Sequence, residues 1–374
     1  MKTSYWVLVF SSSLAAAAQA QTPAATGNAA STGNGSAYGS SVHVYGVVDA
    51  GVVAERGCAD CASARVDSGV ASGSRVGVRG REDLGNDVAA VFTLEAGVSA
   101  DTGQSEPDGL FGRQAYVGLD SPWGALTLGR QYNVQYEALI DVADPFGGGM
   151  AGAASNLFGY TQRRYDNTVK YVSPSMRGIR ASALYSYGES PFSSKFNRAY
   201  GATLGYEHGR FNVRIAHQRK YNMVGTNGPV PIADFSARNT LVAANANLGS
   251  VVLYAGYGYN RGVGSSPWNP SNPYGALIVA TPSTDSRDVL AGVSMPTGAA
   301  TWMVSYIRKD DQTLANRDAN QVAAGVTYSL SRRTSVYGAY AKIENRNGAA
   351  YTVGNATARG RGNSAINVGL RHAF

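Results

Sequence analysis

The sequence predicts an all-β protein, a sixteen-stranded antiparallel β-barrel that crosses a membrane, and three observations lead to this fold class. Apolar and polar residues alternate with a period of two in segments of about ten residues, the length of a membrane-spanning strand. Short turns and long polar loops follow these segments in regular alternation. Only 15% of the residues are charged, and no apolar run long enough for a spanning helix follows the N-terminus.

The N-terminal residues 1–20 have the features of a secretory signal peptide. Lys2 supplies the positive charge, residues 5–10 are apolar, and Ala-Gln-Ala at 18–20 is a small-residue cleavage site. Residues 21–40 are rich in Gly, Ala, Ser and Thr and cannot bury a core, so we expect a flexible segment there. The predicted barrel comprises residues 41–374 of an exported protein.

The direction of the alternation distinguishes a membrane barrel from a soluble one. In one segment Val76 and Val78 oppose Arg75 and Arg79, and other segments also carry basic residues on one face. So many charges cannot lie in a dry core, whereas a lipid-facing apolar surface and a water-filled polar lumen accommodate them. The alternative is a soluble β-sandwich with one solvated face, which explains the regular order of short and long connections less well.

The predicted strands are bounded by turn and loop signals along the whole chain. They lie at residues 42–54, 72–82, 88–99, 112–120, 124–132, 163–173, 178–188, 198–207, 210–221, 238–248, 250–261, 287–295, 300–309, 319–331, 334–344 and 363–374. Tight turns are expected at 83–87, 121–124, 174–178, 208–209, 248–250, 296–298 and 331–333. Long loops are expected at 55–71, 100–111, 133–162, 189–197, 222–237, 262–286, 310–318 and 345–362. The even number of strands is typical of bacterial single-chain barrels.

Four stretches and the last residue carry a family resemblance. They are VYGVVDAGV (44–52), SRVGVRGREDLGNDVAAVFTLE (74–95), RQAYVGLDSPWGALTLGRQYN (113–133), RRYDNTVKYVSP (163–174) and Phe374. Together they resemble the general trimeric porins of β-proteobacteria, the Neisseria/Bordetella/Burkholderia type, over residues 41–374. The resemblance implies a homotrimer in the outer membrane, in contact with lipid and lipopolysaccharide, whose third long loop folds into each barrel. It also implies that Phe374 is the signal read by the barrel assembly machinery.

The loop at 133–162 has features expected of such a constriction. It is the longest predicted loop, and long loops in compact domains are usually functional. Pro145 and Phe146, followed by three glycines, favour a sharp hairpin against a wall. Its candidate constriction carboxylates are Glu137, Asp141 and Asp144. A disordered external loop is the alternative.

Basic side chains on the strands are candidates for the opposite side of the passage. Arg75, Arg79 and Arg164 point into the lumen by parity. Arg130 resembles the wall arginine of the family, but counting along its strand places it on the lipid-facing side with Leu128. Further possible lining residues are Asp49, Asp166, Lys170 and Arg113, the last of which begins its strand, where parity is weakest.

Opposed arginines and carboxylates produce a transverse field in a narrow wet passage, and such rings of charge set ion preference. Four arginines against three loop carboxylates are nearly balanced, so the expected ion preference is taken from the net charge of the chain. This is +7, or +6 once Lys2 is removed, and it predicts a modest anion preference. The leading hypothesis is a channel for passive diffusion of small hydrophilic solutes and inorganic ions. A substrate-specific channel and an adhesin are the alternatives.

Other chemistry finds little support in the sequence. Motifs for phosphate-binding loops and zinc proteases are absent, and His208 and His372 are poorly placed for a catalytic base, so we expect no enzyme, cofactor or metal. The basic residues are not clustered, so we expect no nucleic-acid partner. Cys58 and Cys61 are the only cysteines, and in an exported chain they are expected to form a local disulfide. A redox centre or half of a metal site is the alternative.

Overall fold

The computed structural model describes residues 40–57, 64–106, 109–189, 191, 194–195, 197–221, 236–267, 283–354 and 362–374. The expected signal peptide at 1–20, the segment at 21–40 except its last residue, and both Cys58 and Cys61 lie outside these residues. Among the described residues, no helix has the length and apolar character needed to pass through a membrane.

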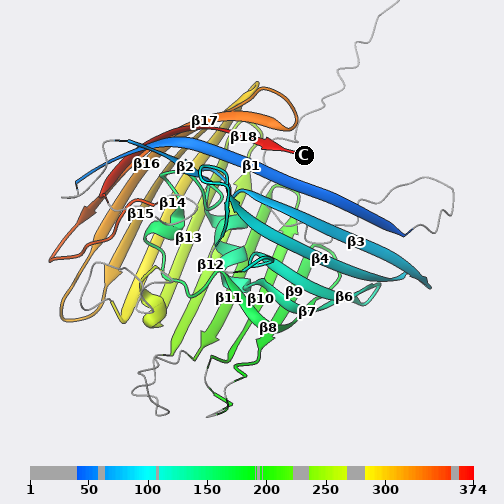
Figure 1. Ribbon diagram of the computed structural model, residues 1–374. Helices are drawn as coiled ribbons and strands as arrows, with labels where there is room; N and C mark the ends of the chain where they lie inside the picture. The colour runs from blue at the N-terminus through cyan, green and yellow to red at the C-terminus, as the bar shows by residue number, and fades with distance from the viewer. Residues whose placement is uncertain are drawn as a thin grey trace, which may run out of the picture.

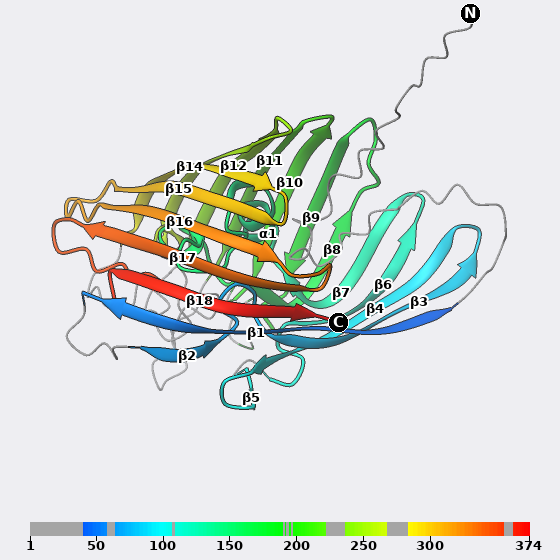
Figure 2. The ribbon, with the colours of Figure 1, turned by 90° about the horizontal axis from the view of Figure 1, so that it is seen from above.

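Sixteen long antiparallel strands close into a barrel, as the sequence predicts (Figures 1 and 2). They are β1 (Ser41–Arg56), β3 (Arg75–Gly85), β4 (Val88–Ser99), β6 (Gln114–Ser121), β7 (Gly124–Tyr132), β8 (Arg164–Val172), β9 (Ile179–Ser186), β10 (Ala199–His208), β11 (Phe211–Lys220), β12 (Ala237–Asn247), β13 (Val252–Gly262), β14 (Asp285–Thr297), β15 (Ala300–Asp311), β16 (Ala319–Ser329), β17 (Thr334–Asn345) and β18 (Ser364–Ala373). Every predicted strand is present, with its ends shifted by at most a few residues.

The barrel closes where β18 returns to β1. Their register runs from Val47 opposite Ala373 to Arg56 opposite Ser364. Beyond it, the N–H of Phe374 donates to the Gly46 carbonyl at 3.1 Å, and the N–H of Gly46 donates back at 3.2 Å. Closure leaves no sheet edge to pair with another chain.

Alternation along the strands separates an apolar outer face from an inner face. On β13, Leu253, Tyr257 and Tyr259 are exposed, whereas Gly258 and Asn260 between and beside them are buried. The exposed residues form the outer surface that a membrane barrel turns toward lipid.

The short strand β2 (Arg65–Ser68) shows that one wall strand is interrupted. It pairs with residues 50–53 of β1, whereas β3 pairs with residues 41–47, so β2 and β3 lie along the same side of β1. Residues 69–74 between them turn inward, with Val70 and Ala71 buried, and we call this segment the inner bend. The predicted strand at 72–82 therefore begins too early. A second short strand, β5 (Gln104–Ser105), pairs with the end of β4.

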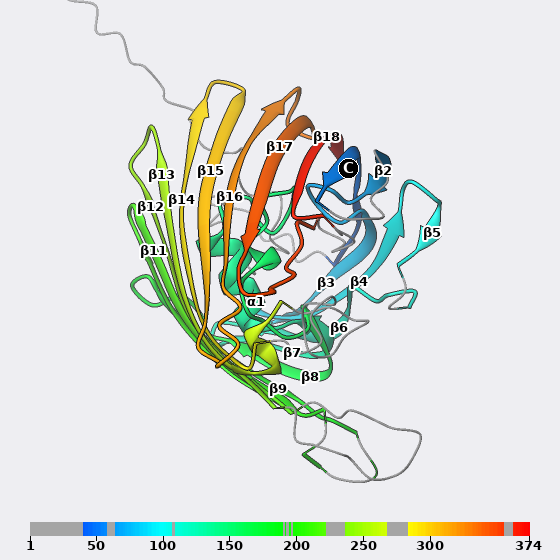
Figure 3. The ribbon, with the colours of Figure 1, turned by 90° about the vertical axis from the view of Figure 1, so that its left-hand side faces the viewer.

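The segment between β7 and β8, residues 133–163, lies inside the barrel, and we call it loop 3 (Figures 2 and 3). It contains α1 (Val134–Ala138), the π-helical turn η1 (Leu139–Ala143) and the 3-10 turn η2 (Ala154–Asn156). Helix α1 contacts β9 to β12, and η1 contacts β11 to β13. A further 3-10 turn, η3 (Val263–Ser265), follows β13 and touches β12 to β14.

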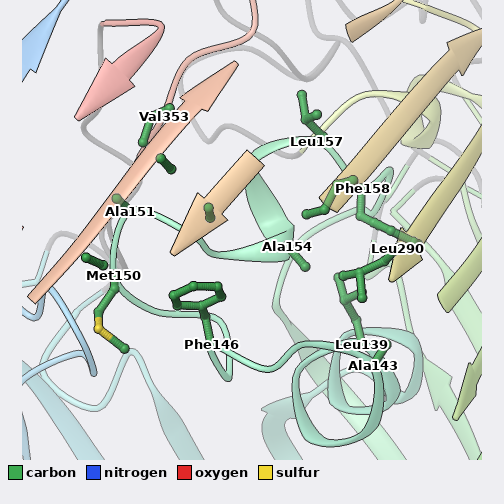
Figure 4. Close-up of a cluster of buried hydrophobic side chains, with 14 of the residues drawn as sticks. Leu139, Ala143, Phe146, Met150, Ala151, Ala154, Leu157, Phe158, Leu290 and Val353 are labelled. Carbon is green, nitrogen blue, oxygen red and sulfur yellow. The ribbon is translucent and has the colours of Figure 1, made fainter. Parts of the chain in front are cut away.

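Loop 3 is held by an apolar cluster on the inner wall, shown in Figure 4. Leu139, Phe146 and Phe158 of the loop belong to the same buried cluster as Leu290 of β14 and Ile307 of β15. The lumen is therefore not polar throughout. Loop 3 covers an apolar part of the wall and removes it from water, which stabilises the packed position of the loop.

Candidate pore constriction

Loop 3 takes its shape from side chains that satisfy its own backbone. Asn133 caps α1, its side-chain oxygen accepting a hydrogen bond from the Tyr136 N–H at 2.7 Å. Asp144 accepts hydrogen bonds from the N–H groups of Phe146 and Gly148, both at 2.9 Å, and of Ala154 at 2.8 Å. Because Asp144 is only 4% exposed, its carboxylate organises the hairpin and does not face the passage.

A buried ion pair fixes the returning part of the loop. The Lys309 Nζ lies 2.7 Å from the Asp288 Oδ1, and neither side chain is exposed. The other carboxylate oxygen of Asp288 accepts from the Gly159 N–H at 2.6 Å and from the Asn260 amide at 2.8 Å. The wall strands β13, β14 and β15 thus hold loop 3 through one carboxylate.

The tip of the loop meets the inner bend. The Met150 N–H donates to the Val70 carbonyl at 2.6 Å. At Gly149 the backbones of the loop and the bend are so close that a Cβ on this residue would lie 1.9 Å from the Ala71 carbonyl oxygen. Asp49 of β1 holds the bend by accepting from the N–H groups of Ala71 and Ser72 at 3.2 and 3.1 Å. Two segments, rather than loop 3 alone, therefore narrow the lumen.

The two remaining loop carboxylates have basic partners on the wall. Glu137 lies 2.6 Å from the Lys170 Nζ of β8, and Asp141 lies 3.5 Å from a guanidinium nitrogen of Arg214 on β11. Burial raises the pKa of Asp141 to about 7, and the nearby Glu137 carboxylate adds to the rise. The sequence predicts Lys170 as a lining residue, whereas it gives no signal that distinguishes Arg214.

Across the lumen, β1, β3 and β4 present a second polar group. Glu95 accepts a hydrogen bond from the Tyr45 hydroxyl at 2.9 Å and lies 3.5 Å from the Arg75 Nε. Arg79 is exposed, and its guanidinium carbon lies 5.4 Å from the centre of the Tyr45 ring. Within the described parts of the chain, no carboxylate forms an ion pair with Arg79.

Arg113 and Arg164 brace the wall behind this group. The Arg113 Nε donates to Glu95 at 2.9 Å, and one Nη of each arginine donates to the Tyr132 hydroxyl, at 3.1 and 2.6 Å. Both arginines are only 8% exposed. Arg113 immediately precedes β6, so the parity of that strand does not direct it, and its side chain turns inward.

Arg130 and Asp166 are paired with each other. Their side chains are 2.6 Å apart, and the Arg130 Nε also donates to the Gly112 carbonyl at 2.6 Å. The register of β7 and β8 shifts here, and Asn167 has a φ of 53°. This bulge interrupts the alternation counted back from Lys170, so parity no longer decides the face of Asp166, whose exposed carboxylate pairs with Arg130. Asp49 faces inward but is fully buried beneath the inner bend.

Comparison with known proteins identifies the family. The model of the Gram-negative porin family matches residues 6–348. The chain belongs to this family. This porin is 31% identical to an outer-membrane porin protein of Bordetella pertussis over 82% of the chain and 84% of the relative. It is 27% identical to the major outer-membrane protein P.IB of Neisseria meningitidis serogroup B over 89% and 94%.

Solved structures share the fold of the porin. An anion-selective porin from Comamonas acidovorans superposes with a TM-score of 0.71 at 23% identity, over 90% of this chain and all of that one. The trimer form of OmpT from Vibrio cholerae superposes with a TM-score of 0.65 at 17% identity, over 90% and 99%.

The family membership confirms the function and location predicted from the sequence. The protein is an outer-membrane porin of a Gram-negative bacterium, a transmembrane β-barrel that forms a water-filled channel for small hydrophilic solutes and ions. Its family is one of channel proteins. The candidate constriction lies between loop 3, the inner bend and the arginines of β3.

Proposed function

We propose that this porin is a passive diffusion channel with a modest preference for anions. Charge pairing at the constriction carries the proposal. Glu137 and Asp141 each have a basic partner on the wall, and Asp144 is enclosed by backbone N–H groups. Arg79 has no such counter-charge among the described residues. An uncompensated positive charge attracts anions into a narrow wet passage.

Two further observations support an anion preference. The chain has a formal net charge of +7, or +6 without Lys2, which is the sign that an anion preference requires. The Comamonas acidovorans neighbour, which has the same fold, is described as anion-selective. An arginine stays protonated at every physiological pH, so the preference persists across that range.

The zero-current potential of the purified porin in a planar bilayer tests this proposal. Under a tenfold KCl gradient we expect a potential of the sign that chloride permeation produces, smaller at high salt because the Debye length falls from about 8 Å at 0.15 M to about 3 Å at 1 M. Cation selectivity of the unmodified protein would refute the proposal. Saturable block by one solute would instead indicate a substrate-specific channel.

We infer that the porin assembles as a homotrimer in contact with outer-membrane lipid and lipopolysaccharide. The trimer form of the OmpT neighbour and the family resemblance support the trimer. The apolar outer face supports contact with lipid. Mass measurement in mild detergent, with and without heating, tests the oligomer, and a monomeric mass in the unheated sample would contradict it.

Three sequence predictions remain proposals that mass spectrometry and assembly assays can test. We propose cleavage after Ala20 and a disulfide between Cys58 and Cys61, which the intact mass of the exported protein would reveal before and after reduction. We propose that Phe374 is recognised by the barrel assembly machinery, and its place at the closing seam supports this. Normal assembly after deletion of Phe374 would contradict that role.

A further inference from the structure

Outward-facing arginines form a row across neighbouring strands near the long-loop end of the barrel. In the strand register, Arg219 of β11 lies opposite Arg238 of β12, and Arg238 lies opposite Arg261 of β13. Arg287 of β14 lies one step away, opposite Tyr259. We call these four residues the arginine row.

The neighbours of these arginines along each strand show that the row faces outward. Gln218, Asn239, Asn260 and Ser286 are fully buried on the inner side of β11 to β14. Each is adjacent in sequence to one arginine of the row, and successive side chains of a strand point to opposite faces. Arg238, Arg261 and Arg287 are accordingly exposed on the outside of the barrel, and Arg219 is partly exposed.

The row carries an excess of positive charge. Directly opposed like charges on neighbouring strands destabilise a sheet. Arg261 has an ion-pair partner, Asp285 at 3.5 Å, and Asp310 of β15 lies opposite Arg287 in the register. Arg219 and Arg238 have no ion-pair partner in the described part of the protein. Two basic residues of the same outer surface are paired instead, since Arg308 lies 3.4 Å from Asp310 and Lys342 lies 3.4 Å from Glu344.

Aromatic rings hold two of these arginines in place. The Tyr221 ring centre lies 4.4 Å from the Arg219 guanidinium carbon and 5.0 Å from that of Arg198, which adds a fifth positive charge beside the row. The guanidinium carbon of Arg261 lies 5.4 Å from the centre of the Tyr259 ring. Tyrosines of this kind belong at the level of the lipid headgroups, so they indicate the depth of the row in the membrane.

The strand sequences give the same depth. Ile215, Val242, Tyr257 and Val289 are exposed on the outer face four or fewer residues from the row, toward the short turns. At about 3.3 Å per residue, the apolar surface begins within about 13 Å of the arginines. The long loops of such barrels face the cell exterior, so the row lies at the headgroup level of the outer leaflet.

We propose that the arginine row binds the phosphorylated headgroup of an outer-leaflet glycolipid. Arginine presents paired N–H donors to phosphate oxygens. Strands are about 4.8 Å apart, so Arg219 and Arg261 are about 10 Å apart along the row and can serve two phosphates on one headgroup. Contact between the rows of two copies would bring like charges together, which favours the anionic lipid. The proposal assigns residues to the lipopolysaccharide contact inferred above and is independent of ion preference.

Native mass spectrometry of the purified oligomer tests the site. The test variant is Arg219→Gln/Arg238→Gln/Arg261→Gln, with Arg238→Gln alone as a milder change. The matched control is Arg308→Gln/Lys342→Gln, which removes basic residues from the same outer face where they are already paired. Each protein is incubated with bisphosphorylated lipid A, with dephosphorylated lipid A, or with bisphosphorylated lipid A plus inorganic phosphate.

We expect the unmodified porin to retain bisphosphorylated lipid A about tenfold better than the dephosphorylated form. The triple variant should lose this difference, Arg238→Gln should reduce it, and the control should keep it. Equal retention by the triple variant and the unmodified porin would overturn the proposal. Full displacement by millimolar inorganic phosphate would assign the row to free anions and overturn the lipid assignment. We expect the zero-current potential of the triple variant to be unchanged, which would show that lipid binding by the row and the proposed ion preference are independent.

Discussion

Arg79 is the residue on which the proposed ion preference depends most directly. Its guanidinium is exposed against the Tyr45 ring, and no described carboxylate pairs with it. In water, an ion about 5 Å from a unit charge has an interaction energy of about 0.8 kcal/mol. At 0.15 M salt, with a Debye length of about 8 Å, about half of this remains.

Arg79→Ala should therefore reduce the anion preference by a measurable amount. A change of about 0.4 kcal/mol alters the local concentration of each ion about twofold in opposite directions, so the chloride-to-potassium permeability ratio should fall about fourfold. At 1 M salt the same calculation gives less than about twofold. The measurement is the zero-current potential in a tenfold KCl gradient centred on about 0.15 M.

Two controls separate charge from other effects of the substitution. Arg79→Lys keeps the charge and should keep most of the preference. Lys342→Ala removes an equal charge from the outer surface, where Lys342 is paired with Glu344, and should leave the potential unchanged. If Arg79→Ala and Lys342→Ala gave the same ratio as the unmodified porin, the reasoning from Arg79 would be wrong.

Three further predictions concern the loop and the seam. Burial raises the pKa of Asp141 to about 7, so lowering the pH from about 8 to about 6 should neutralise it and increase the anion preference by up to about fourfold, a step that Asp141→Asn should lack. Gly149→Ala should separate loop 3 from the inner bend and increase the noise of the open-channel current, because its Cβ would lie 1.9 Å from the Ala71 oxygen. Gly46→Ala should lower the yield of assembled barrel several-fold, since its Cβ would lie 2.3 Å from the Phe374 ring and 2.8 Å from the Arg75 oxygen. Gly338→Ala is the control for both, because its Cβ would meet no atom closer than 3.6 Å, and equal behaviour of test and control would contradict either prediction.

The strands could be predicted from the sequence because alternation and turn residues act locally. Each strand pairs with a neighbour along the chain, so a correct order of strands gives the barrel. Because alternation is a local pattern, it does not predict the direction of a side chain at a bulge or just outside a strand. The bulge at Asn167 turns Asp166 toward Arg130, and Arg113 lies just outside the strand whose alternation would direct it.

The roles within the constriction depend on contacts between distant segments, which a single sequence does not display. Asp144 is an acidic residue of the loop and therefore a candidate pore charge by sequence. Its three N–H partners come together only in the folded hairpin. Arg214 has inward parity like several other basic residues, and only the position of loop 3 brings it to Asp141. The apolar inner wall around Leu290 and Ile307 is likewise explained only once the loop covers it.

The inner bend links the width of the passage to the completion of folding. Asp49, which holds the bend, also accepts a hydrogen bond from the Tyr337 hydroxyl of β17 at 2.8 Å, and β1 meets β17 only across β18. The first and last parts of the chain must therefore come together before the bend is fully supported and can in turn receive the tip of loop 3 through Val70. A barrel whose seam is open would lack this support for the bend, so narrow permeability depends on closure of the seam between the two ends of the chain.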